Sequence, residues 1–277
     1  MSKELDAFNA DGFFVARELL DKEAIAQFLH SMKKTIEDQL RGVSAPGEHN
    51  DVFSALKALH GADIDRYKRV LGALWRKEET HRLAHHHNIV NFLKGKFGWT
   101  DIFLPGGHVV HIMAHELRIP NGYFGFVTHQ DFPSVQGSLD GVVVWFPLVD
   151  VNKDNFPLEV IPRTHKLGVL PTIKHGTSTS EVEPEFYNQS DFVPVEVNVG
   201  DVIFMSVFTV HRSSLEGKLG NCRIAISTRF DNGDEPTFVD RAYPTAYIRS
   251  VAREQYYDNF PTQEQIEATF RRTWSNN

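Results

Sequence analysis

The stretch Gly200-Asp201-Val202-Ile203-Phe204-Met205-Ser206-Val207-Phe208-Thr209-Val210-His211 joins a turn, a strongly apolar run and a histidine. Gly-Asp favours a turn, and the β-branched and aromatic residues that follow are typical of a strand. We therefore predict a strand over residues 202–210. His211 would stand at its end, where a side chain can enter the mouth of a barrel.

Six further segments show similar strand patterns. They cover residues 109–117, 125–129, 141–147, 158–161, 192–197 and 222–230. Turn-forming residues separate them, and no helical pattern intervenes. The pattern predicts antiparallel strands in a closed or double-sheet architecture rather than a parallel α/β sheet.

The first hundred residues instead have helical periodicity. Apolar residues spaced by three and four predict a helix over residues 25–40, just after the N-cap residue Asp21, and a second over 64–75. A weaker pattern predicts a third helix over 80–94. Near the end of the chain, residues 262–274 predict a closing helix.

We expect one domain, mainly β with α, across residues 1–277. No internal repeat or long linker divides the chain, and barrels and sandwiches often reach this length as one unit. The expected parts are a mostly helical N-terminal layer (1–100), a β core (101–235) and a C-terminal extension with a helix (236–277).

Composition limits the classes of partner. The formal charge is −7, and no lysine or arginine run resembles that of a nucleic-acid binder. The sequence has neither a secretory apolar segment nor a run long enough to cross a membrane. The single cysteine, Cys222, suits a reducing compartment. We expect a cytoplasmic protein that acts on a small molecule, in an oligomeric state that the sequence does not decide.

A pair of candidate metal ligands stands at His129-Gln130-Asp131. Alternate residues of an extended segment share a face, so this imidazole and carboxylate would lie side by side. His49-Asn50-Asp51 has the same spacing, but it follows a turn-forming stretch and has no alternating apolar flank. Strand context therefore favours His129 and Asp131.

Two imidazoles and one carboxylate on one face of an octahedron hold a catalytic Fe(II) and leave the opposite face open. His211 is the candidate for the third ligand, from a strand distant in sequence. Arg223 opens the next predicted strand twelve residues later. Its guanidinium could reach across a hairpin and bind a dicarboxylate through a bidentate pair.

Other histidines offer weaker alternatives. His85, His86 and His87 would point in different directions from a helix, which favours a polar face over a metal site. His108, His111 and His115 form a rival cluster, but their segment has the pattern of a strand. There, His111 and His115 share a face that could point toward a substrate, and His108 does not.

The chain resembles the phytanoyl-CoA dioxygenase family of Fe(II)- and 2-oxoglutarate-dependent oxygenases over nearly its whole length. Four motifs occur in the order typical of that family. They are Phe8-Asn9-Ala10-Asp11-Gly12-Phe13, His129-Gln130-Asp131, Ile161-Pro162-Arg163-Thr164-His165-Lys166, and Val199-Gly200-Asp201-Val202-Ile203-Phe204 followed by His211 and Arg223.

The resemblance implies a fold, a reaction and a set of site residues. The fold is the double-stranded β-helix, a jelly roll of the cupin kind. The reaction is hydroxylation by Fe(II), 2-oxoglutarate and O2 with release of succinate and CO2. His129, Asp131 and His211 would act as catalytic iron ligands, and Arg223, Ser213 and Trp145 would bind the cosubstrate.

Two positions depart from the family pattern. Asn155-Phe156-Pro157-Leu158 has Phe156 where the family often has glycine, and Arg163 replaces the glycine of the third motif. Both departures are expected to reshape substrate access rather than to abolish iron binding.

The substrate is expected to be a small polar or anionic metabolite or natural-product intermediate. Four residues near the proposed mouth favour it, namely His111, His115, Arg118 and Arg163. Two alternatives stay open at this point: a jelly-roll binding protein without turnover, and a metal-dependent cupin isomerase or lyase that needs no cosubstrate.

Overall fold

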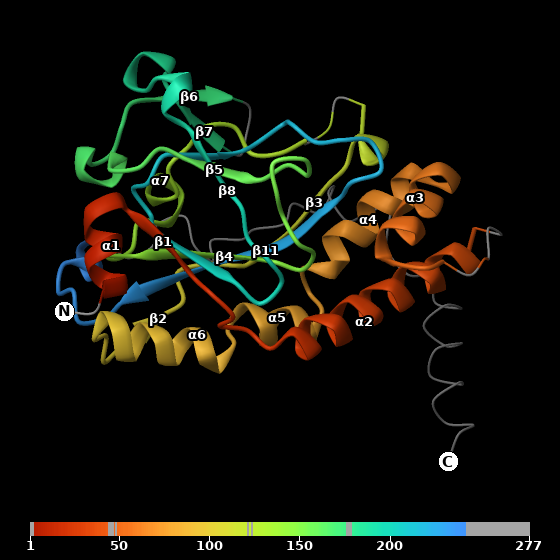
Figure 1. The fold of residues 1–277 in the computed structure, drawn as a ribbon, viewed down its shortest axis with the longest axis horizontal. Coiled ribbons are helices and arrows are strands. Elements are labelled where there is room, and N and C mark those ends of the chain that lie inside the picture. The colour runs from red at the N-terminus through yellow and green to blue at the C-terminus, as the bar shows by residue number, and fades with distance from the viewer. Residues whose placement is uncertain are drawn as a thin grey trace, which may run out of the picture. The chain divides into compact units, whose positions relative to one another are not determined.

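Two antiparallel sheets pack face to face in the computed structural model, which describes residues 3–241 except 44–46, 48, 121, 123 and 176–178. The larger sheet has the strand order β1-β9-β4-β11-β2, and β3 also pairs with β11 (Figure 1). Its strands are β1 (Phe13–Ala16), β2 (Ile102–Phe103), β3 (Val109–Met113), β4 (Val142–Pro147), β9 (Val202–Ser206) and β11 (Arg223–Asn232).

The smaller sheet has the order β10-β5-β8. A separate two-stranded ribbon pairs β6 with β7. The strands are β5 (Leu158–Val160), β6 (Thr172–His175), β7 (Thr179–Val182), β8 (Val193–Val195) and β10 (His211–Ser213). Together, the two facing sheets confirm the predicted jelly-roll fold.

The strand predicted over residues 202–210 is wrong in one respect, because the chain changes sheets within it. β9 ends at Ser206 in the larger sheet, and β10 begins at His211 in the smaller one, opposite Val160. The apolar pattern continues through the crossing because the residues there are also buried. His211 is therefore the first residue of a strand rather than the residue after one.

The helices are α1 (Lys3–Asp11), α2 (Lys22–Arg41), α3 (Val52–Ala62), α4 (Ile64–Leu74), α5 (Glu78–Ala84), α6 (His87–Phe92), α7 (Phe132–Val135) and α8 (Phe238–Arg241). The first two predicted helices are confirmed as α2 and α4. Asp21 caps α2 by accepting a hydrogen bond from the Glu23 amide at 2.9 Å.

Two helical predictions need correction. The helix predicted over 80–94 is divided, because His85 ends α5 and His86 caps α6. Helix α3 was not predicted, although Asp51 and Ser54 form a capping box at its start. Asp51 of the sequence His49-Asn50-Asp51 thus serves as a helix cap, which explains this aspartate without a role in metal binding.

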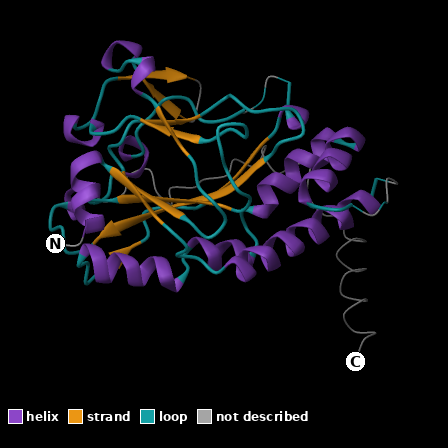
Figure 2. Cartoon of the chain, viewed as in Figure 1, coloured by secondary structure: helices purple, strands orange, loops and turns teal. Residues whose placement is uncertain are grey.

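The helical layer covers one face of the larger sheet, and the smaller sheet lies on the other side (Figures 1 and 2). Strand β4 is buried along its whole length. Val144 and Phe146 face the helices, whereas Val143 and Trp145 face the smaller sheet. This double burial explains why the strand is a continuous apolar run rather than an alternating one.

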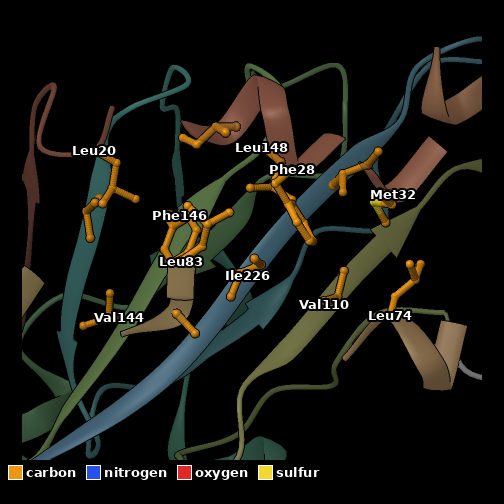
Figure 3. Close-up of a cluster of buried hydrophobic side chains, with 14 of the residues drawn as sticks. Leu20, Phe28, Met32, Leu74, Leu83, Val110, Val144, Phe146, Leu148 and Ile226 are labelled. Carbon is orange, nitrogen blue, oxygen red and sulfur yellow. The ribbon is translucent and has the colours of Figure 1, made fainter. Parts of the chain in front are cut away.

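Figure 3 shows the interface between the helices and the sheet. Phe28 and Met32 of α2 and Leu83 of α5 are buried with Phe146 and Ile226 of the larger sheet. Such interdigitated side chains fix the position of the sheet that carries the site residues.

Some predicted elements differ or fall outside the description. Residues 125–129 form only an isolated bridge, at His129, and the strand predicted over 109–117 ends at Met113. The helix predicted over 262–274 lies outside the described residues. Among the helices that are described, none is both long and apolar enough to span a membrane.

Candidate metal and cosubstrate site

Three side chains converge between the two sheets. One ligand atom each from His129, Asp131 and His211 lies within 4.8 Å of those of the other two, and all three residues are buried. The two histidines form an antiparallel backbone bridge, in which each amide donates to the other's carbonyl at 2.9 and 3.0 Å. This bridge sets their rings 4.2 Å apart.

Backbone carbonyls orient both imidazoles. Nδ1 of His129 is 2.7 Å from the Val127 carbonyl oxygen, and Nδ1 of His211 is 2.9 Å from that of Thr209. Donation from Nδ1 leaves the lone pair on Nε2, and in His129 this atom is 3.7 Å from Asp131 Oδ1. Metal-binding histidines commonly have this second hydrogen bond.

Asp131 reaches the cluster by a route different from the predicted one. Its backbone is helical (φ −78°, ψ −27°), and it stands at the N-cap position of α7, without a side-chain capping bond, instead of continuing a strand. Strand alternation is therefore not the reason that it lies beside His129. The turn into α7 brings the carboxylate back toward the two rings.

Arg229 of β11 is a site residue that sequence reasoning missed. Its Nη2 lies 3.1 Å from each carboxylate oxygen of Asp131, and its Nε lies 3.3 Å from Oδ2. The strand period of two, counted from Arg223 through Ser227, was the available signal, because these residues share one face.

The electrostatics keep the cluster in its metal-binding form. Burial lowers the pKa of His129 and lowers that of His211 to about 3. Burial alone would raise the pKa of Asp131, but Arg229 and the two histidines together hold it below its usual value. The set therefore offers two neutral imidazoles and one carboxylate, which is the state that binds a divalent cation.

Gln130, between the two ligands, faces away from them and holds a neighbouring loop. Its Nε2 donates to the carbonyls of Gly168 (2.8 Å) and Phe208 (2.6 Å), and its Oε1 accepts from the Leu170 amide at 2.9 Å. The middle residue of the His-x-Asp sequence thus fixes the backbone on both sides of the ligands.

Arg223, Ser213 and Trp145, which the family resemblance groups together, lie near one another. Arg223 is 1% exposed. Its guanidinium donates to the Phe156 carbonyl at 2.6 Å, to Ser213 Oγ at 3.0 Å and to Met113 Sδ at 2.7 Å. It lies 6.0 Å from the Trp145 ring. These three acceptors carry no charge.

A small cavity, about 20 Å³ in volume, lies against the two histidine ligands. His129, His211, Trp145, Ser213, Phe126, His111, Ser227 and Arg229 are among its lining residues. Phe126, Ser213 and Arg212 also line a wider groove beside it, which we call the mouth. The mouth includes Glu159, Glu181, Tyr187, Gln189 and Glu216.

Only one of the four proposed substrate residues lines this cavity. His111 does so, with its Nε2 2.9 Å from Ser227 Oγ. His115 turns away because β3 ends before it, and its Nε2 bonds the Gly217 carbonyl at 2.8 Å. Arg118 lies over the Phe124 ring, and Arg163 is exposed. The last three line neither the cavity nor the mouth.

The two departures from the family pattern keep a glycine-like backbone. Phe156 has φ +57° and Arg163 has φ +70°, both in the left-handed region that favours glycine. Phe156 is fully buried, and its carbonyl is the one that Arg223 contacts. The strained backbone of Phe156 thus lies next to Arg223, the predicted cosubstrate-binding residue.

The first and third motifs meet around Gly12. A Cβ at Gly12 would lie 2.4 Å from His165 Nδ1 and 2.7 Å from Thr209 Oγ1, and its φ is +83°. The Gly12 carbonyl accepts from Thr209 Oγ1 at 2.8 Å, and the Arg163 amide donates to the Asp11 carbonyl at 2.8 Å. These contacts fix the backbone just before His211.

Comparisons with known proteins match the chain to one family. The family model for Phytanoyl-CoA dioxygenase (PhyH) matches residues 8–215. A Dictyostelium discoideum protein described as phytanoyl-CoA dioxygenase domain-containing protein 1 homolog is 32% identical over 98 residues. That alignment covers 33% of this chain and only 34% of the curated relative.

Several solved structures have a similar fold. The epimerase SnoN, in complex with Fe3+, alpha ketoglutarate and nogalamycin RO, gives a TM-score of 0.56 at 16% identity, over 90% of this chain and 91% of its own. The non-heme monooxygenase ThoJ gives 0.55 at 18%, over 82% and 76%. EctD from S. alaskensis, with 2-oxoglutarate and 5-hydroxyectoine, gives 0.52 at 14%, over 92% and 86%. At such identities, the likeness shows the fold alone.

Proposed function

Because the chain belongs to the phytanoyl-CoA dioxygenase family, we propose that it is a 2-oxoglutarate-dependent non-haem iron oxygenase that hydroxylates a small polar molecule. The observation that carries the proposal is the buried convergence of His129, Asp131 and His211. The two histidines line a cavity that Ser213 also lines, and Ser213 accepts a hydrogen bond from the guanidinium of Arg223.

The donor set fits Fe(II). Two imidazole nitrogens and one carboxylate are the ligands of the facial triad, which leaves positions open for a chelating cosubstrate and O2. Bound iron, with 2-oxoglutarate and O2, supplies the oxidation that hydroxylates the substrate and releases succinate and CO2. The chain's own contribution is to hold the ligands in place and to enclose the reacting atoms.

Arg223 is the proposed binding residue for the distal carboxylate of 2-oxoglutarate. A guanidinium matches a carboxylate through two parallel hydrogen bonds. Because Arg223 is buried, this ion pair would be little screened by solvent. Ser213 already contacts the guanidinium, and Trp145 supplies an apolar wall beside it.

The mouth supports a polar substrate but not an anionic one. Glu159 and Glu216 are among the residues that line it, and Arg212, which also lines it, already pairs with Glu159 at 2.6 Å. We therefore propose a small neutral or cationic molecule with hydroxyl or amino groups. This replaces the anionic preference that the sequence suggested from Arg118 and Arg163, which lie elsewhere.

The proposed site is tested without knowledge of the substrate. Anaerobic protein mixed with Fe(II) and 2-oxoglutarate is expected to give the weak visible charge-transfer band of a chelated complex. Asp131→Ala should remove the band by loss of a ligand. Arg223→Leu should weaken 2-oxoglutarate binding, whereas Arg118→Leu, outside the cavity, is the matched control and should not.

The outcomes separate the remaining alternatives. A protein that gives no band, and that forms no succinate in air with any substrate of a metabolite panel, is a binding protein of the same fold. Metal-dependent turnover that Arg223→Leu leaves intact identifies an isomerase or lyase that needs no cosubstrate. We also propose a cytoplasmic location, which the single cysteine supports.

A further inference from the structure

A second group of three histidines lies in the helical layer. One ring nitrogen each from His81, His85 and His108 lies within 4.8 Å of those of the other two. His81 belongs to α5, His85 ends that helix, and His108 directly precedes β3. From the sequence, His85 was considered with His86 and His87, and His108 with His111 and His115. The grouping of His81, His85 and His108 was therefore not predicted.

The helix places two of the three rings on one face. His81 and His85 are four residues apart, a spacing that sets side chains one above the other. The ring of His108 approaches from the sheet side, with its centroid 4.3 Å from that of His81 and 5.9 Å from that of His85. The three residues thus join two segments that are distant in sequence.

Backbone carbonyls select the tautomers of His85 and His108. Nδ1 of His85 is 3.0 Å from the His81 carbonyl oxygen, and Nε2 of His108 is 2.5 Å from that of Trp75. Donation from these atoms leaves lone pairs on Nε2 of His85 and Nδ1 of His108. Nε2 of His85 is buried and has no hydrogen-bond partner among the described residues. The proposed iron ligands His129 and His211 are held in the same way.

The surrounding contacts hold the group in place before any ion binds. The Trp75 carbonyl contacts His108, and the Trp75 indole Nε1 donates to the Val110 carbonyl at 3.2 Å. One residue at the end of α4 therefore fixes both sides of the turn into β3. His85 also packs edge-to-face against Phe230 of β11, with centroids 6.0 Å apart.

We propose that His81, His85 and His108 bind a second metal ion, a late first-row divalent cation such as Zn2+. Imidazole ligands without a carboxylate suit Zn2+, Ni2+ or Cu2+ better than Mg2+ or Ca2+. His108 is buried and His81 is exposed, so an ion can enter from the His81 side and keep a water as fourth ligand. The ion would fasten α5 to the start of β3.

The test uses the full chain after chelator treatment. Calorimetric titration with Zn2+ is expected to show two sites in the unaltered protein and one in the double variant Asp131→Ala/His211→Ala. Adding His81→Gln to that double variant should weaken Zn2+ binding at the remaining site by at least about tenfold. Loss of a metal ligand should cost at least as much affinity as loss of a residue that only orients a ligand. His87→Gln, outside the cluster, is the matched control.

A second readout keeps the result independent of folding and of the proposed function. Co2+ bound to the double variant should give visible d-d bands that His81→Gln abolishes, and His81 is exposed, so this change should leave circular dichroism unaltered. His81→Gln alone should keep the Fe(II)·2-oxoglutarate band. A double variant that binds no Zn2+, or binding that His81→Gln leaves unchanged, overturns the second site without touching the first.

Discussion

The guanidinium of Arg229 contacts both carboxylate oxygens of Asp131, with Nη2 3.1 Å from each. Asp131 is 3% exposed, so its charge is balanced inside the protein and not by water. A divalent cation bound by Asp131 and the two histidines would also balance the negative charge of this carboxylate. Arg229 and the metal are therefore alternative partners for one buried charge.

We expect Arg229→Met to destabilise the metal-free protein by about 3–5 kcal/mol, because it leaves a buried carboxylate without its ion pair. Urea unfolding of metal-free and Mn2+-loaded protein measures this, and the loss should be smaller with Mn2+ bound. Arg82→Met, which removes an exposed pair with Glu78, is the control and should cost less than about 0.5 kcal/mol. An equal loss with and without Mn2+ would contradict the idea of alternative partners.

Gln130→Leu is expected to lower stability and weaken metal binding together. The change removes three hydrogen bonds and leaves the Leu170 amide unsatisfied, at a cost of roughly 1–3 kcal/mol for a buried group. It also loosens the backbone between the two ligands. Thermal unfolding and Mn2+ titration measure the two effects. Gln27→Leu, on the exposed face of α2, should change neither, and an unchanged Mn2+ affinity in Gln130→Leu would limit Gln130 to a role in folding.

Arg163→Gly should leave stability unchanged or raise it by up to about 1 kcal/mol, since glycine relieves the left-handed strain but has more freedom to lose on folding. Gly12→Ala should do the reverse and cost about 2–4 kcal/mol, through strain and a clash with His165. Differential scanning calorimetry of both variants tests the pair. A destabilised Arg163→Gly would mean that the arginine side chain makes a contact that matters.

Stability of the metal-free protein should fall as pH drops below about 6.5. Burial lowers the folded pKa of His129 and lowers that of His211 to about 3, so the unfolded chain takes up these protons first. Each such histidine then contributes a slope of about 1.4 kcal/mol per pH unit below 6.5, and for His211 this loss continues as pH falls toward 3. Urea midpoints between pH 7.5 and 4.5 measure the slope, which His211→Asn should reduce. A flat profile in this range would show that the rings are not held neutral.

Sequence predicted what depends on local pattern and on motif order. The apolar runs at β4 and β9 predicted two strands of the larger sheet, and the sequence grouped His129, Asp131 and His211 as one set of metal ligands. The grouping of Arg223 with Ser213 was implied by the family resemblance, and the two side chains are hydrogen-bonded in the structure.

Features set by tertiary contacts were not predictable in this way. No local signal shows that the chain changes sheets after Ser206, because residues on both sides of the crossing are buried. Asp131 lies beside His129 because the chain makes a helical turn there. Strand alternation predicted the same neighbour, but for the wrong reason. The His81 and His108 contact joins segments that no spacing rule connects.

The pairing of β1 with β9 has a consequence for how the chain assembles during synthesis. Phe13 lies opposite Met205, so strand partners are separated by roughly 190 residues. The larger sheet cannot close until nearly all of the described chain has left the ribosome, and such distant pairing folds slowly. Until then, the face of β4 that carries Val143 and Trp145 is not yet covered by the smaller sheet. The time before closure is therefore the period in which the nascent protein is most exposed to aggregation.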